Sequence, residues 1–135
     1  MAASVFDHPF LSGLFGDDEA ASLFTAEADI QAMLAFETAL AGAQADAGVI
    51  PAAAADAIAA ACGGFEPDLA ALRAATAKDG VVIPELVRQL RRAAGDAHGA
   101  FVHHGATSQD AIDTSLMLRL KPFAALLAAR LEQLD

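Results

Sequence analysis

The last quarter of the chain carries a regular pattern of apolar side chains that restricts what this end of the molecule can form. Apolar residues recur there in steps of three and four, at Ile112, Leu116, Leu120, Phe123, Leu127, Leu131 and Leu134. Such steps place side chains on one face of a helix. Pro122 lies inside the pattern, where it removes one backbone hydrogen bond, so we expect a kink. The pattern predicts one long helix whose apolar face needs partners.

The residues before this pattern have the composition of a helix start. Thr107 stands where an N-cap is expected, and Asp110 follows three residues later, at capping-box spacing with Asp in place of Glu. A helix start attracts carboxylates, because its N–H groups are unpaired and its end of the macrodipole is positive. The hydroxyls of Thr107 and Ser108, with His103 upstream and Gly105 leaving room for close approach, would form a carboxylate cradle. Spacing alone favours the alternative, an ordinary cap with His103 as a packed loop residue.

The rest of the chain is divided by proline and glycine in the manner of short helices. Prolines at first-turn positions and glycines after the last turn are typical of such helices. The predicted helices begin at Asp17, Thr25, Pro51, Pro67 and Pro84, and residues 1–16 form an irregular arm that packs its apolar side chains. Residues 81–83 are the only hint of extended chain. The sequence therefore predicts an all-α fold of five or six short helices followed by one long helix.

Charge and composition exclude several classes of function. The net charge of −10 argues against nucleic acid and anionic membranes as partners. There is no uncharged apolar run of membrane-spanning length and no basic region of a secretory signal. The lone Cys62 has no partner for an internal disulfide, which fits a cytoplasmic protein. Residues 1–72 contain no Lys or Arg, so contacts to an anionic ligand are expected mostly from the second half.

One string and several upstream segments resemble a known family. The string from His103 through Gly105, Thr107, Ser108, Gln109, Asp110 and Asp113 to Thr114 resembles the first signature region of the fumarase/aspartase superfamily, and most closely its muconate-lactonising branch. Residues 11–16, 36–44, 48–51 and 80–88 also look like that branch. The resemblance covers nearly the whole chain. His104 departs from it, since a large aromatic residue such as tryptophan is expected there.

The resemblance implies a division of the chain and a set of site residues. Residues 1–106 would be the N-terminal helical domain with its signature loop, and residues 107–135 a truncated first helix of the central bundle. The implied catalytic residues are His103 and Ser108, the substrate-binding residues are Thr107, Ser108, Gln109 and Arg88, and the structural residues are Gly105, Asp110, Asp113 and Thr114.

The implied reaction is an isomerisation of a small tricarboxylate, in which one substrate carboxylate adds across a double bond to close a lactone. The resemblance implies no cofactor and no metal, and a homotetramer with sites shared between subunits. The superfamily's catalytic serine comes from a loop far downstream, so we expect the 135-residue chain to be inactive alone.

Other chemistries fit the sequence less well. His98, His103, His104 and Asp110 lack the spacing of a zinc site. The string around Ser108 lacks the Gly-x-Ser-x-Gly elbow of a hydrolase, and no phosphate-binding or dinucleotide fingerprint occurs. Two alternatives stay open: a fumarate-releasing lyase like adenylosuccinate lyase, and a helical interaction module without catalytic activity.

Overall fold

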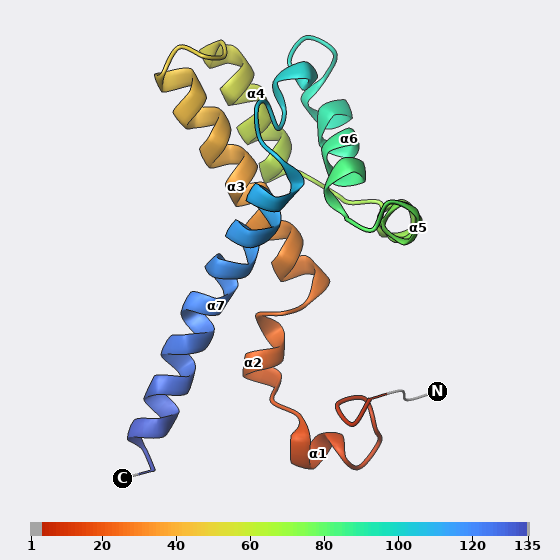
Figure 1. Cartoon of the computed structure of the whole chain (residues 1–135), viewed down its shortest axis with the longest axis vertical. Helices are drawn as coiled ribbons and strands as arrows, with labels where there is room; N and C mark the ends of the chain where they lie inside the picture. Colours follow the sequence, from red (N-terminus) through yellow and green to blue (C-terminus); the bar gives the residue numbers. More distant parts are fainter. Residues whose placement is uncertain (1–3, 135) are drawn as a thin grey trace.

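The computed structural model describes residues 4–134, and every regular element in that range is helical (Figure 1). The elements are α1 (Ser12–Phe15), α2 (Asp18–Ser22), α3 (Ala26–Asp46), α4 (Ala52–Gly63), α5 (Leu69–Asp79), α6 (Ile83–Ala94), the 3-10 turn η1 (Gly99–Phe101) and α7 (Ser108–Glu132). The all-α prediction is confirmed. Within this range no helix is both long and apolar enough to cross a membrane.

Local side-chain caps account for most of the helix starts. Asp17, Thr25 and Asp68 each accept a hydrogen bond from the backbone N–H three residues further on, which satisfies a donor that the helix leaves unpaired. The predicted start at Pro67 was too early, because Asp68 takes the cap position and α5 begins after it. At the other end of α5, Gly80 has φ +78°, a left-handed conformation that glycine adopts without strain.

The arm at the N-terminus is only partly irregular. Residues 12–15 form one helical turn, which the sequence did not indicate. The apolar side chains of the arm were predicted to pack, yet Phe10 and Leu14 are 75% and 76% exposed. The arm therefore presents apolar groups to its surroundings instead of burying them in this chain.

The core lies where α3, α4 and α6 meet, in the upper part of Figure 1. α3 and α4 pack as an antiparallel pair, α6 packs on α4, and η1 packs on α6. Side chains with almost no exposure come from each of them, including Leu34, Ile58, Leu86, Leu90 and Val102. Val102 brings the chain that leads into α7 onto this core, so the start of α7 has a fixed position.

The long helix α7 crosses α3 and then runs away from the core (Figure 1). Its fully buried residues are Ala111 and Ser115, and the Ser115 hydroxyl donates to the Asp29 carboxylate at 2.6 Å. Of the predicted apolar stripe, four members are exposed: Leu116, Leu127, Leu131 and Leu134. The helix is continuous through Pro122. The expectation that the stripe finds few partners inside the chain agrees with these exposures.

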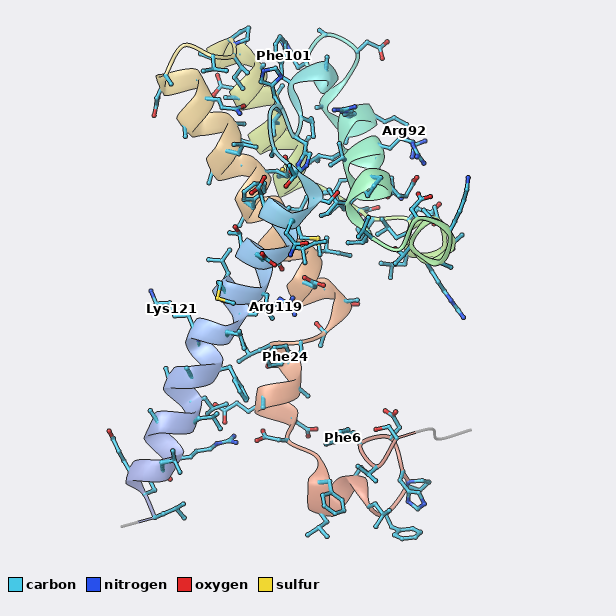
Figure 2. All side chains as sticks on the ribbon, in the orientation of Figure 1. Phe6, Phe24, Arg92, Phe101, Arg119 and Lys121 are labelled. Carbon is cyan, nitrogen blue, oxygen red and sulfur yellow. The ribbon has the colours of Figure 1, made fainter. Side chains whose placement is uncertain are left out.

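Long side chains join the far half of α7 to α2 and the residues that flank it. Arg130 is hydrogen-bonded to Asp17 and donates to Glu19 at 2.8 Å. The Arg130 hydrogen bond and the Ala20 backbone N–H lower the pKa of Asp17 to about 2. Closer to the core, Phe24 meets Phe123 edge-to-face, and Figure 2 shows Arg119 beside Phe24.

Candidate functional site

A cavity of about 520 Å³ lies between α6 and the loop that leads into α7. One wall is the side of α6 that carries Ile83, Arg88 and Arg91. The other wall is the loop and the first turn of α7. The lining residues are Ile83, Pro84, Val87, Arg88, Arg91, His103, Ala106, Thr107 and Ser108. Four residues singled out from the sequence therefore line one cavity: Arg88, His103, Thr107 and Ser108.

The predicted capping box is present at the start of α7. The backbone N–H of Thr107 donates to Asp110 at 2.8 Å, and the Thr107 hydroxyl donates to the same oxygen at 2.9 Å. These two bonds, the backbone bond first, lower the pKa of the Asp110 carboxyl. Because the Thr107 hydroxyl donates its hydrogen bond to Asp110, Thr107 serves the helix start. Ser108, half-buried in the first turn, is the other hydroxyl on the cavity wall.

His103 is held by a carboxylate that the sequence reasoning did not assign to it. Its Nδ1 lies 2.6 Å from Oε1 of Glu37, and the two side chains are 11% and 3% exposed. No local sequence pattern indicates this pair, because the two residues are 66 positions apart. The available signal was a charged residue on an apolar stripe, since carboxylates are seldom buried without a partner.

The turn between His103 and Thr107 depends on left-handed backbone conformations. His103 has φ +60° and Gly105 has φ +69°. A Cβ at Gly105 would meet no atom of the protein within 4 Å, so the structure assigns this glycine a conformational role, and the expectation that it leaves room for a ligand stays a prediction. His104 stands where an aromatic residue was expected. Its backbone carbonyl accepts a hydrogen bond from the Gln44 side chain at 2.7 Å.

The remaining motif residues, Gln109, Asp113 and Thr114, lie on α7 outside the cavity lining. The amide of Gln109 donates to the carboxylate of Asp113 at 2.5 Å, and both residues are exposed. Thr114 is half-buried one turn further on. None of these three is among the residues that line the cavity.

The arginines of α6 have hydrogen-bond or ion-pair partners in the fold, and two of them also line the cavity. Arg88 pairs with the buried carboxylate of Glu85, and Arg92 lies 3.7 Å from the same group. Arg91 donates to the carbonyl of Val102 at 3.2 Å and so ties α6 to the loop. Arg88 and Arg91 both line the cavity, which places two positive charges opposite the start of α7. A cavity with these charges favours an anionic ligand.

Two other groups bear on cofactors and reactivity. Within residues 4–134 no three His, Cys, Asp or Glu side chains lie close enough together to hold a metal ion. Cys62 is a free, buried cysteine whose pKa is raised by that burial, so it is held as a thiol.

The helical arrangement of this chain is shared with solved enzymes of the fumarase/aspartase superfamily. A 3-carboxy-cis,cis-muconate cycloisomerase from Pseudomonas aeruginosa is 46% identical over 116 residues, which is 84% of this chain and 25% of that protein. The chain belongs to the superfamily and is similar to the N-terminal part of its 3-carboxy-cis,cis-muconate cycloisomerases.

Solved structures give the same result. The 3-carboxy-cis,cis-muconate lactonizing enzyme from Pseudomonas putida matches with a TM-score of 0.82 and 38% identity, over 90% of this chain and 28% of that one. A fumarate lyase from a Mesorhizobium species matches with a TM-score of 0.83 and 42% identity, over 87% of this chain and 28% of that one. No model of a known protein family matches. The chain spans about a quarter of the length of the curated relatives that it matches.

Proposed function

We propose that this chain is the N-terminal part of an enzyme that converts 3-carboxy-cis,cis-muconate to a carboxymuconolactone. The observation that carries the proposal is the cavity in which Ser108 and the start of α7 face Arg88 and Arg91. These two walls offer separate positive regions to a substrate that carries several carboxylates. The similarity to the cycloisomerase from Pseudomonas aeruginosa supports this substrate class.

The proposed chemistry is an isomerisation in which no atom is lost. One substrate carboxylate adds across a double bond, a C–O bond forms, and the neighbouring carbon takes up a proton. Negative charge that develops beside another carboxylate is stabilised by the Ser108 hydroxyl and the N–H groups of the first turn of α7. Arg88 holds a carboxylate, and His103 lies beside the reacting atoms. Thr107 would bind a carboxylate only by releasing Asp110. Gln109 would reach the substrate only by releasing Asp113.

The direct test is an assay on the complete protein that contains this chain. Loss of the ultraviolet absorbance of the muconate diene, without added metal or nucleotide, is the expected result. Ser108→Ala should lower kcat/KM by about 10²–10³-fold, the usual cost of one lost donor to a developing oxyanion. Thr76→Ala, on α5 and outside this cavity, is the matched control and should leave the rate unchanged. An unaltered rate in Ser108→Ala would reduce Ser108 to part of a helix start.

A second candidate is a lyase that releases fumarate, and the match to the fumarate lyase from Mesorhizobium favours it. The same complete protein separates the two candidates. Cleavage of adenylosuccinate with the muconate diene left intact would transfer the assignment to the lyase. Activity on neither compound would favour a helical interaction module.

We also propose that the protein is a cytoplasmic homotetramer in which α7 forms part of a shared helical bundle. The exposed leucines of α7 support this arrangement, because such a row of apolar side chains is stabilised by burial against other helices. The buried free thiol of Cys62 supports a reducing compartment. The small tricarboxylate and further copies of the chain are then its partners.

A further inference from the structure

We propose that Glu37 is the positioning residue of this cavity: its buried carboxylate holds His103 by Nδ1, so that Nε2 is the nitrogen presented to the ligand. The Nδ1–Oε1 distance of 2.6 Å is that of a short, charge-assisted hydrogen bond. Because a carboxylate only accepts hydrogen bonds, Nδ1 must be the donor. The tautomer of His103 is therefore set from α3, outside the cavity wall.

The burial of Glu37 indicates that the carboxylate is not an incidental contact. Its side chain is 3% exposed, and within the described residues its second oxygen, Oε2, is buried without a hydrogen-bond partner. A carboxylate in such a place costs free energy, because it loses solvation that one hydrogen bond only partly replaces. His103 is the one cationic or potentially cationic group that the described structure pairs with it. The free-energy cost of burying Glu37 must therefore be offset by the rest of the fold. The structural result of this burial is a fixed position of the His103 ring.

A second polar side chain of α3 holds the same loop. Gln44, seven residues after Glu37 and therefore on the same helix face, donates to the carbonyl of His104 at 2.7 Å. Between these two contacts, His103 keeps φ +60°, a conformation that residues other than glycine seldom adopt. Glu37 thus fixes the ring and Gln44 fixes the backbone, and both act on the loop from the face opposite α6.

The consequence for chemistry concerns one atom. Any proton that His103 gives to or takes from the substrate moves through Nε2, while the Nδ1 proton stays in the bond to Glu37. This step rests on the proposed function, whereas the tautomer itself does not. Glu37 is a positioning residue because it touches the ring of His103 and not the cavity.

Two-bond proton–nitrogen NMR of the 135-residue chain in alkaline solution tests the tautomer without any substrate. The chain has four histidines, and His103→Gln identifies the signal of His103. The expected spectrum shows a proton on Nδ1 of His103. Glu37→Ala should move that proton to Nε2, whereas Glu37→Gln should keep it on Nδ1, because the amide oxygen still accepts. Gln44→Ala is the matched control, since it frees the His104 carbonyl and leaves the Glu37 contact in place.

Two results would overturn the proposal. One is an unprotonated Nδ1 in the unaltered chain, which needs no variant and so decides the matter even where Glu37→Ala does not fold. The other is an unchanged His103 spectrum in a folded Glu37→Ala chain. In the complete enzyme, Glu37→Ala should lower kcat at least tenfold with a small change in KM, and Glu37→Gln should restore part of it. A protonated Nδ1 in a protein without cycloisomerase activity would reject the proposed function and leave the role of Glu37 intact.

Discussion

Hydrogen bonds decide what each polar group beside the cavity is free to do. The Thr107 hydroxyl is committed to Asp110, and Nδ1 of His103 is committed to Glu37. Ser108 lines the same cavity in the first turn of α7, where its hydroxyl stands beside unpaired N–H groups. Neighbouring residues with similar chemistry therefore have different tasks: Thr107 maintains the helix start, and Ser108 is available to a ligand.

Replacing Thr107 by alanine should lower the free energy of unfolding of the chain by about 1 kcal/mol, within the usual range for a lost N-cap. The reason is that the N–H of Asp110 keeps only the Thr107 carbonyl as acceptor and the Asp110 carboxylate loses the hydroxyl donor. Urea denaturation followed by circular dichroism measures the change. In an Asp110→Asn background the same replacement should cost less, since both residues belong to one box. Equal costs in the two backgrounds would contradict the capping role.

Residue-level prediction from the sequence succeeded where partners are close in the chain. The Thr107–Asp110 box spans three positions, so spacing alone is enough to find it. The Glu37–His103 pair and the Gln44–His104 bond join residues 66 and 60 positions apart, so no local pattern indicates them. The conformational role of Gly105 was also missed, because a glycine that makes room and a glycine with positive φ look the same in a sequence.

At Gly99 the backbone of η1 lies close to that of α6. A Cβ at Gly99 would lie 2.5 Å from the carbonyl oxygen of Arg91, so Gly99→Ala must push η1 away from α6. We expect a loss of about 1–3 kcal/mol in the free energy of unfolding, as for other overpacked positions. The matched control is Gly42→Ala within α3, where a Cβ meets nothing within 4 Å. That replacement should stabilise the chain by about 0.5–1 kcal/mol.

Thermal and urea unfolding of both glycine variants gives the comparison. Opposite signs support the packing described for η1 and α6. A neutral Gly99→Ala would mean that η1 moves away at little cost, and the Arg91 bond to Val102 would then lose its fixed geometry.

The contact between α7 and the N-cap of α2 should respond to acid. The pKa of Asp17 is lowered from 3.8 to about 2, chiefly by the Arg130 hydrogen bond, so its contribution to stability is complete above 3.8 and is lost as the pH falls toward 2. Carbon-detected NMR titration of the Asp17 carboxyl measures the midpoint. In Arg130→Met, which keeps an apolar stem, the midpoint should rise toward 3.8. A midpoint that is the same in both proteins would show that the start of α2 is not held by Arg130.

Helix existence could be predicted from the sequence, but the packing face of α7 could not. Prolines and glycines divide the chain so regularly that the starts of α4 and α6 follow from Pro51 and Pro84. On α7 the leucine stripe is the stronger signal, yet the two fully buried residues of the helix are Ala111 and Ser115, and of the stripe Ile112 packs against the core. Small side chains permit the close approach of two helices and carry almost no hydrophobic signal, so periodicity alone does not reveal this face.

For the whole molecule, the exposed side of α7 predicts self-association. Leu127 and Leu131 are 42% and 64% exposed, and burying a leucine is worth about 1.5–3 kcal/mol. Static light scattering should therefore give a mass above the 13.8 kDa of one chain. Leu127→Asp combined with Leu131→Asp should lower the mass toward that value, whereas Leu69→Asp, at an exposed leucine of α5, should not. A monodisperse monomer in dilute solution would contradict the shared helical bundle.

The crossing of α7 over α3 also sets an order of assembly during synthesis. α3 and α4 are neighbours in the chain and can pair as soon as residue 63 has left the ribosome. The bond from Ser115 to Asp29 closes a segment of 86 residues, and the Arg130 bond to Asp17 closes one of 113. Closing long segments is slow compared with local pairing. The cavity therefore receives its second wall late, and a nascent chain halted at α6 would hold the arginines with no helix start to face them.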